Sequence, residues 1–291
     1  MEIPAADVEV DASLVRCLLR EQFPVLAQQP ITFLNNGWDN YLFRLGSELM
    51  VRLPRRHFGA ELILKEQKYL PLLAPRLPLP VPVPLHVGQP GCDYPWYWSI
   101  SAWLAGESVD DKPLPASSVK QWAEFLTALH IAAPENGPRN EYRGVPLATR
   151  HDAFMERLLR LRDQQLVNFE AVNILWQQGL DADADFSPCW LHGDLHPMNI
   201  LSDNDRIVGV IDWGDLCVGD VATDLASFFM LFPKDVAEHS MRHDYHAGEA
   251  QITRARTCAA FFAVVLLDTG INSSPRQTAV ARRIFSNLGL P

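Results

Sequence analysis

Three oxygen-bearing side chains gather in one short stretch of the chain. Asp194 and Asn199 are five positions apart, and a proline between them interrupts any helix, so both are expected on a loop. Two apolar, strand-like runs follow, separated by a polar turn at residues 203–205. Asn199 begins the first run and Asp212 ends the second. A hairpin of this kind brings Asn199 and Asp212 to the same end, beside the loop that carries Asp194.

Such a set of side chains suits phosphoryl transfer. One carboxylate accepts or orients the proton of an attacking hydroxyl, and a pair of hard oxygen ligands holds Mg²⁺ against a triphosphate. Because Mg²⁺ keeps several waters and phosphate oxygens around it, two protein ligands are enough. Asn199 and Asp212, one amide and one carboxylate, are therefore the candidate Mg²⁺ ligands.

The same residues belong to two sequence motifs. His-Gly-Asp-Leu-His-Pro-Met-Asn begins at His192, and Ile-Asp-Trp-Gly surrounds Asp212. Together they resemble the catalytic loop and the metal-binding aspartate of the protein-kinase fold, in the form typical of the aminoglycoside phosphotransferase family. That family includes kinases of aminoglycosides, macrolides and other small hydroxylated molecules. The resemblance implies that Asp194 is the catalytic base and that His192 orients the backbone of the loop. It also implies that Asn199 and Asp212 bind Mg²⁺.

The first third of the chain should then supply the contacts to the nucleotide. Gly37 to Asn40 lies where the family has its nucleotide-covering loop, although a plain turn is the alternative. Arg52 stands where kinases place a strand lysine, and a guanidinium can bind phosphate oxygens bidentately. Glu66, on the next predicted helix, resembles its ion-pair partner; the alternative is an exposed helix carboxylate. Backbone groups from Ser101 to Trp103 are expected to contact the purine. Nothing in the sequence distinguishes ATP from GTP.

Two kinds of local pattern must position these residues. Short apolar runs broken by turn residues predict strands in the first third, at residues 31–34, 41–45, 49–53, 85–87 and 96–103. Helical spacing of apolar residues predicts helices at 60–73, 117–132, 151–178 and 254–267. Five prolines between Pro75 and Pro84 predict an extended connector.

The layout and the resemblance together predict an α+β, bilobal, protein-kinase-like fold. A small lobe with an antiparallel sheet and one main helix would span residues 1–104 and bind the nucleotide. A larger, mostly helical lobe would span residues 105–291 and carry catalysis and acceptor binding.

Composition limits the partners. The 291 residues include 25 Lys and Arg against 35 Asp and Glu, a net charge of -10, which argues against nucleic acid and anionic membranes as partners. Five dispersed cysteines argue against a disulfide framework and a structural zinc site. Met1 to Val10 has no signal-peptide pattern, and the longest apolar run, residues 258–267, is too short to span a bilayer. A cytoplasmic protein is expected.

The sequence leaves the identity of the acceptor molecule undetermined. A cationic molecule such as an aminoglycoside would suit an acidic wall. The candidates are Asp152, Glu156, Asp235, Glu238, Asp244, Glu249 and Asp268, for which solvated helix faces are the favoured alternative. A macrolide or another bulky alcohol would suit an apolar wall made from Phe154, Phe228, Phe229, Met230 and Phe232, for which ordinary core is the alternative.

Two other classes of function also fit features of the sequence. A metallohydrolase would bind zinc or manganese through His192, Asp194, His196 and Asp212. A catalytically silent, kinase-like nucleotide-binding module is suggested by arginine, in place of lysine, at position 52.

Overall fold

One part of the molecule is built on a five-stranded antiparallel sheet. The computed structural model describes residues 5–182 and 186–290, so part of the N-terminal segment considered above lies outside the described residues. The strands run in the order β1-β2-β3-β5-β4. Their bounds are β1 (Ile31–Asn36), β2 (Asn40–Leu45), β3 (Leu49–Pro54), β4 (Pro84–Gly88) and β5 (Trp98–Ala102). The predicted strands are thus confirmed, with the first turn shifted to residues 37–39.

One face of this sheet is covered by a helix that the sequence analysis missed. Along β2, buried Tyr41, Phe43 and Leu45 alternate with half-buried residues, so the buried set points to one side. Helix α1 (Ala12–Gln22) packs against that side through Val15, Leu18 and Leu19. The signal was present, because these three residues have helical spacing and Asp11 accepts a hydrogen bond from the Leu14 N–H as N-cap.

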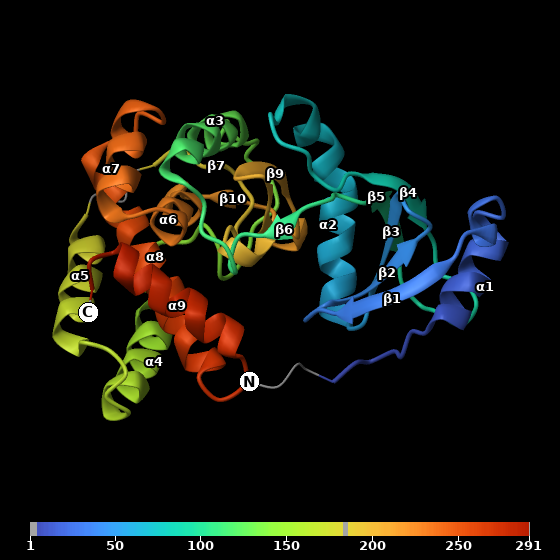
Figure 1. Ribbon diagram of the computed structural model, residues 1–291, viewed down its shortest axis with the longest axis horizontal. Helices are drawn as coiled ribbons and strands as arrows, with labels where there is room; N and C mark the ends of the chain where they lie inside the picture. The colour runs from blue at the N-terminus through green and yellow to red at the C-terminus, as the bar shows by residue number, and fades with distance from the viewer. Residues whose placement is uncertain (1–4, 183–185, 291) are drawn as a thin grey trace.

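The other face of the sheet is covered by α2 (His57–Leu73), the predicted main helix. Gln67 fastens it to the sheet, since Nε2 donates to the carbonyl of Trp98 and to the hydroxyl of Ser99. Figure 1 shows α2 standing between the sheet and the helical part of the molecule. A short 3-10 turn, η2 (Ala74–Arg76), and the extended proline-rich connector follow it. This helix can therefore link the two parts.

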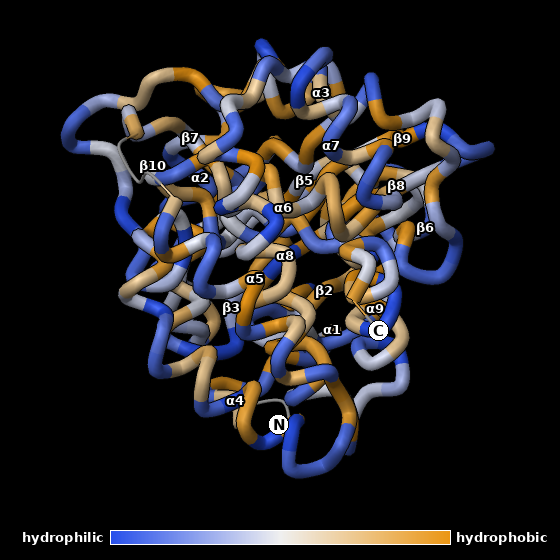
Figure 2. Tube along the Cα trace, turned by 90° about the vertical axis from the view of Figure 1, so that its left-hand side faces the viewer, coloured by the Kyte–Doolittle hydropathy of each residue, from blue (hydrophilic) through white to orange (hydrophobic). Residues whose placement is uncertain are grey.

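The second part is mainly helical, as predicted. Its helices are α3 (Val119–Leu129), α4 (His151–Asp163), α5 (Phe169–Asp181), α6 (Ala222–Leu231), α7 (Lys234–His243), α8 (Glu249–Gly270) and α9 (Pro275–Asn287). Hydrophobic stretches run through the middle of the molecule and hydrophilic ones along its outer loops (Figure 2). The α+β class is confirmed, and between β5 and the helices the chain passes from one part to the other.

Helix α8 is the centre of the helical part. It packs against α4, α5, α6 and α9, and most of its apolar residues are buried. By length and composition it is the one helix of the described residues that could cross a membrane, although the apolar run expected from the sequence was shorter. Its burial is typical of the core helix of a globular protein.

Short strands hold the two motifs. A three-stranded sheet has the order β6-β8-β9, from β6 (Glu107–Ser108), β8 (Ile200–Asp203) and β9 (Arg206–Val210). A second small sheet pairs β7 (Cys189–Leu191) with β10 (Cys217–Gly219). The predicted hairpin is present. Asn199 does not begin a strand, however, but ends the 3-10 turn η5 (Pro197–Asn199), because the preceding proline favours a turn there.

A disulfide corrects the expectation from the cysteine pattern. Cys17 of α1 is bonded to Cys92, in the loop between β4 and β5, 75 positions away. Cys189, Cys217 and Cys258 are free. Spacing alone did not show that α1 and this loop are neighbours. Because such bonds are commonest in oxidising compartments, the cysteines no longer support a cytoplasmic location.

The loop that follows β7 is fastened to α6 by a buried carboxylate. Asp224 accepts hydrogen bonds from the backbone N–H of His192 at 2.7 Å and of Gly193 at 2.8 Å. Its Oδ2 also lies 3.3 Å from Nε2 of His130. Gly193 has φ +88°, and a Cβ there would lie 2.7 Å from the carbonyl oxygen of Asp215, so only glycine fits. The hydrogen bonds to Asp224 and the close approach of the Asp215 carbonyl therefore fix the backbone at the start of this loop.

Removing the disulfide should destabilise the sheet-bearing part. For Cys17→Ser we expect a loss of about 2–4 kcal/mol in the free energy of unfolding, because the bond closes a long loop in the unfolded chain. Urea unfolding measures this loss, and Cys189→Ser is the control. Reductant should cause no further loss of stability in Cys17→Ser. Five free thiols in the unfolded, unreduced protein would contradict the bond.

Neutralising Asp224 should loosen the loop. In Asp224→Asn the amide has one acceptor oxygen and an NH₂ group that cannot accept a backbone N–H, so a buried donor loses its partner. The expected cost is about 1–3 kcal/mol of stability, measured by urea unfolding. Asp111→Asn, at an exposed position, serves as the control. Equal stability of the two variants would show that Asp224 does not hold the loop.

Candidate active site

Asp194 lies at the centre of a network of hydrogen bonds. Arg143 donates from Nη2 to its Oδ1 at 2.6 Å. Nε2 of His196 lies 3.3 Å from its Oδ2. Asn199 donates from Nδ2 to the backbone carbonyl of Asp194 at 2.9 Å. The carboxylate is 18% exposed, so it is held in place and still reachable from outside.

This network keeps Asp194 charged. Burial favours the protonated carboxyl group, but the positive charge of Arg143 and the contact with His196 outweigh it. The pKa of Asp194 is therefore well below its usual value. An ionised carboxylate at this position can accept a hydrogen bond from a hydroxyl group.

His192 connects the two motifs. Its buried ring accepts the Asp194 N–H at Nδ1, 3.2 Å away, and donates from Nε2 to the carbonyl of Ile211 at 3.0 Å. These bonds assign the proton to Nε2. Both ring nitrogens are thus engaged within the protein, so His192 is not free to bind zinc. The described residues contain no cluster of three or more His, Cys, Asp or Glu suited to a metal, which disfavours the metallohydrolase.

Asn199 and Asp212 lie on adjoining segments. The Ile211 N–H donates to the carbonyl of Asn199 at 2.9 Å. Since Asn199 uses Nδ2 to bond Asp194, its Oδ1 is turned away, and no described residue donates to it. Asp212 has a left-handed backbone, φ +63°, of the kind that clusters at functional sites, and its side chain is 59% exposed. One amide oxygen and one open carboxylate fit the hard-oxygen preference of Mg²⁺.

The predicted pair of Arg52 and Glu66 is formed. Nη1 of Arg52 lies 2.7 and 2.6 Å from the two carboxylate oxygens of Glu66, and both side chains are buried. Nη2 of Arg52 lies 3.6 Å from Oδ1 of Asp212, so the pair reaches the second motif. Burial opposes the charged guanidinium, but Glu66 and Asp212 raise the pKa of Arg52. A fixed cation therefore stands beside the candidate metal ligand.

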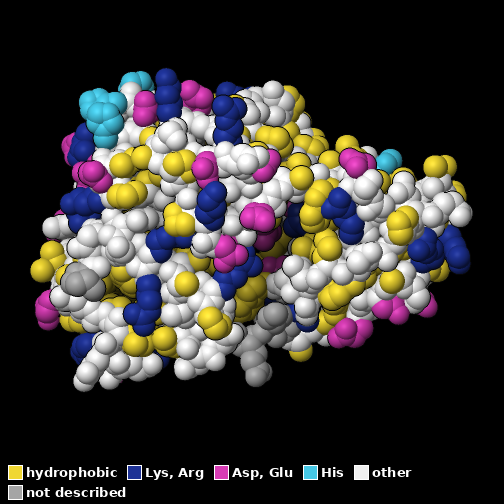
Figure 3. Space-filling view, viewed as in Figure 1, with side chains coloured by type: hydrophobic (Ala, Val, Ile, Leu, Met, Phe, Trp, Pro, Cys, Tyr) yellow, Lys and Arg dark blue, Asp and Glu magenta, His cyan; other side chains and the backbone are white. Residues whose placement is uncertain are grey.

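The two parts of the molecule meet next to Asp212. Helix α2 packs against the 3-10 turn η6 (Trp213–Asp215), directly after Asp212. In the space-filling view the surface is hollowed between the two parts, and side chains of both charges gather there (Figure 3). Arg52 of β3 and Asp212 of the second motif, 3.6 Å apart, bring the candidate residues of the two parts together.

The turn after β1 is closed by its own backbone. The Gly37 N–H donates to the carbonyl of Asn40 at 2.9 Å. Oδ1 of Asn40 is buried and has no hydrogen-bond partner among the described residues. Arg55 is buried and donates to the carbonyl of Gly37 at 3.2 Å. The hydrogen bond from Arg55 therefore stabilises the turn.

The residues at the end of β5 differ in which polar groups they could offer to a ligand. Ser101 is buried on β5, between β3 and β4, and its Oγ has no hydrogen-bond partner among the described residues. The Trp103 N–H donates to the carbonyl of Glu48 at 2.8 Å, and Arg44 lies 3.8 Å above its ring. That N–H extends the ladder between β3 and β5 and is not available to a purine, contrary to expectation.

Sequence reasoning missed Arg143. It lies in the loop before α4, where no local pattern marks it, and it contacts the loop of Asp194 only in the folded chain. Besides Asp194 it contacts Oδ2 of Asp215 at 3.4 Å, and Asn140 donates to Oδ1 of Asp215 at 2.8 Å. Asp215 is therefore part of this network and not a solvated loop residue.

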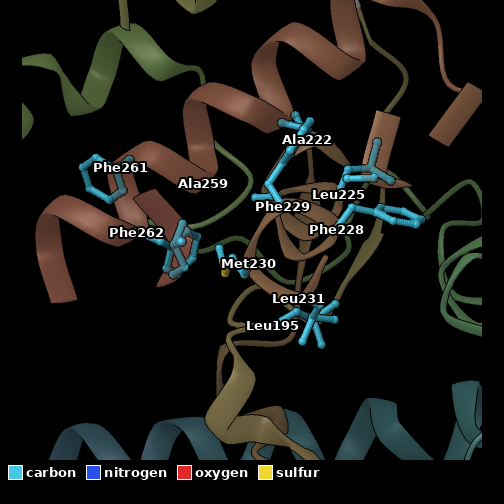
Figure 4. Close-up of a cluster of buried hydrophobic side chains, with 14 of the residues drawn as sticks. Leu195, Ala222, Leu225, Phe228, Phe229, Met230, Leu231, Ala259, Phe261 and Phe262 are labelled. Carbon is cyan, nitrogen blue, oxygen red and sulfur yellow. The ribbon is translucent and has the colours of Figure 1, made fainter. Parts of the chain in front are cut away.

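The candidates for the acceptor wall lie in two kinds of surroundings. Four of the seven candidate acids are paired with arginines: Glu156, Glu238, Glu249 and Asp268. The candidate apolar residues are fully buried in the core; Figure 4 shows those of α6 packed together with α8. The apolar candidates are thus ordinary core, the alternative stated from the sequence. The acidic wall stays a prediction, because Asp152, Asp235 and Asp244 have no arginine partner among the described residues.

Comparisons with known proteins agree with this geometry. The model of the phosphotransferase enzyme family matches residues 30–261. Viomycin phosphotransferase of Streptomyces vinaceus is 27% identical over 157 residues, which are 48% of this chain and 52% of that protein. The matches span only 25% and 52% of the length of the first two curated relatives.

Solved structures share the fold. The GDP complex of aminoglycoside 2'-phosphotransferase-IIIa has a TM-score of 0.71 at 19% identity, over 96% of this chain and 99% of that chain. For macrolide 2'-phosphotransferase type I the TM-score is 0.60 at 22% identity, over 96% and 97%. The predicted kinase-like, α+β fold is thereby confirmed. Because the family model covers most of the sequence, from β1 to the middle of α8, the chain belongs to the phosphotransferase enzyme family.

Proposed function

We propose that this protein is a small-molecule kinase that transfers the γ-phosphoryl group of a nucleoside triphosphate to a hydroxyl group. The observation that carries the proposal is the ionised Asp194, connected through His192 and Ile211 to Asp212 and through its own backbone to Asn199. Phosphoryl transfer depends mainly on positioning and charge stabilisation, and this network supplies both.

In the proposed reaction Asp194 accepts a hydrogen bond from the acceptor hydroxyl. The hydroxyl oxygen forms a bond to the γ-phosphorus, and the bond between that phosphorus and the bridging β,γ-oxygen breaks. The electron pair leaves with the nucleoside diphosphate, and the hydroxyl proton passes to Asp194 and then to solvent. Arg143 keeps the carboxylate charged and fixed in orientation before transfer.

Arg52 is the proposed cation for the triphosphate. Glu66 fixes its orientation, and Asn40 and Ser101 each have a buried oxygen without a described partner, so they are available to the nucleotide. Asn199 Oδ1 and Asp212 would hold Mg²⁺, which would offset the charge of the phosphates. Residues 1–104 would thus form the nucleotide-binding lobe and residues 105–291 the catalytic lobe. GDP in the name of one structural neighbour makes GTP a donor to test beside ATP.

The acceptor is proposed to be a hydroxylated small molecule. The names of the relatives include viomycin, an aminoglycoside and a macrolide, so antibiotics belong in any screen. The Arg52–Glu66 pair supports an active kinase over a silent module, because the arginine makes the ion pair expected of a kinase lysine.

The main test is the variant Asp194→Asn. Loss of the carboxylate should lower transfer by about 10²–10⁴-fold, because the hydroxyl loses its proton acceptor. Nucleotide affinity, measured by calorimetry with Mg²⁺, should stay near that of the wild type. A radiolabelled donor, ATP or GTP, is tested against aminoglycosides, macrolides, viomycin and simple polyols. Transfer that is unchanged in Asp194→Asn would refute the role of this residue.

A second test concerns the nucleotide half of the site. Glu66→Gln removes the charge that orients Arg52, so KM for the nucleotide should rise about 10-fold or more. Glu61→Gln, exposed on the same helix, is the matched control and should behave like the wild type. Urea unfolding of both variants separates a local effect from loss of structure. An unchanged nucleotide KM in folded Glu66→Gln would exclude this role of the pair.

A further inference from the structure

Arg150 is a half-buried cation without a counter-ion. It directly precedes α4, and its guanidinium lies 5.0 Å from the ring centre of Tyr142 and 5.1 Å from that of Phe261. No described carboxylate lies within ion-pair distance of it, and its buried Nε has no hydrogen-bond partner among the described residues. Buried polar groups are nearly always paired, so this one calls for an explanation.

Its surroundings make the cation still less favourable. Burial lowers the pKa of Arg150, and the neighbouring charges of Arg143 and Arg157 lower it further. Those neighbours have partners, because Arg157 binds Asp268 at 2.6 Å and Arg143 binds Asp194 at the same distance. The positive end of the α4 dipole also lies next to Arg150. Of these three arginines, only Arg150 has no carboxylate partner among the described residues.

This cation is connected to the catalytic carboxylate. Arg143, which contacts Asp194, lies 5.0 Å from the ring centre of Phe262, and the rings of Phe261 and Phe262 are 6.4 Å apart. Figure 4 shows both rings on α8. Arg150 is thus linked to Arg143 through the adjoining rings of Phe261 and Phe262. All of these residues belong to the helical part and none to the sheet that carries Arg52.

We propose that Arg150, assisted by Arg143, binds an oxyanion of the acceptor. The substrate class would be a hydroxylated small molecule that carries a carboxylate or a phosphate group, with its hydroxyl directed at Asp194. This inference rests on the proposed kinase function. A guanidinium held between two aromatic rings has a fixed plane, which suits bidentate hydrogen bonds to such a group.

The same features argue against a cationic acceptor at this position. An ammonium group would face Arg143 and Arg150, while the nearby acids Glu156 and Asp268 are already paired with arginines. The net charge of the chain favours cations over its surface as a whole, but the side chains nearest to the acceptor hydroxyl decide its binding.

The test compares acceptors that differ only in the anionic group. Glycerate is paired with glycerol, gluconate and glucose 6-phosphate with glucose, and glucosamine is the cationic member. Binding is measured by calorimetry with Mg²⁺ and a non-hydrolysable nucleotide, and transfer is measured with ATP and GTP. We expect at least one acid to bind about 10-fold or more tightly than its neutral counterpart. The carboxylate and phosphate members show which oxyanion is preferred.

Variants make the assignment specific. Arg150→Gln should weaken binding of the anionic acceptor about 10–100-fold and raise its KM, with nucleotide KM unchanged. Arg150→Lys should recover part of the loss, and Arg139→Gln, exposed in the same loop, is the control. Equal thermal unfolding of the variants shows that they are folded.

The two proposals fail in different ways. If no acid binds better than its neutral or cationic counterpart, or if Arg150→Gln binds the acids like the wild type, the oxyanion site is refuted, even where other acceptors are phosphorylated. If acids bind through Arg150 but no acceptor in any panel is phosphorylated, the oxyanion site stands and the kinase function is refuted.

Discussion

The buried carboxylate of Asp224 is the constraint on which the site depends. By accepting the backbone N–H groups of His192 and Gly193 it fixes the start of the loop that carries Asp194 to α6. His192 is then placed to bond Ile211 on one side and the Asp194 N–H on the other. One buried acid in a core helix thereby aligns the two motifs, because each backbone group it binds has no alternative partner in water.

A second connection joins the two parts of the molecule. Arg52 belongs to the sheet, Glu66 to α2 and Asp212 to the second motif, and the guanidinium of Arg52 reaches both acids. The packing of α2 against η6 supports the same junction. The position of α2 therefore controls the distance between the cation and Asp212, and any movement of this helix would change both the nucleotide contacts and the candidate metal ligands together.

Charge is arranged locally in a way that overall composition does not reveal. The chain carries a net charge of -10, yet the residues next to Asp194 include Arg143 and, beyond it, Arg150. Acids such as Asp268 are neutralised by arginines from α4. The net charge of the chain therefore does not predict the charge near Asp194. At short range, direct contacts between charged groups outweigh the screened charges of the rest of the surface.

The sequence by itself determined the strands of the five-stranded sheet, the helices near residues 117–132, 151–178 and 254–267, and the two motifs that carry Asp194, Asn199 and Asp212, because hydropathy period and motif spacing are local properties. Tertiary structure alone decided the rest. Arg143 contacts Asp194 across 51 positions and Cys17 bonds Cys92 across 75, and no local pattern records such pairs. Partners brought together by packing depend on the whole fold, so only the folded chain shows which charges are paired and which, like that of Arg150, remain for a ligand.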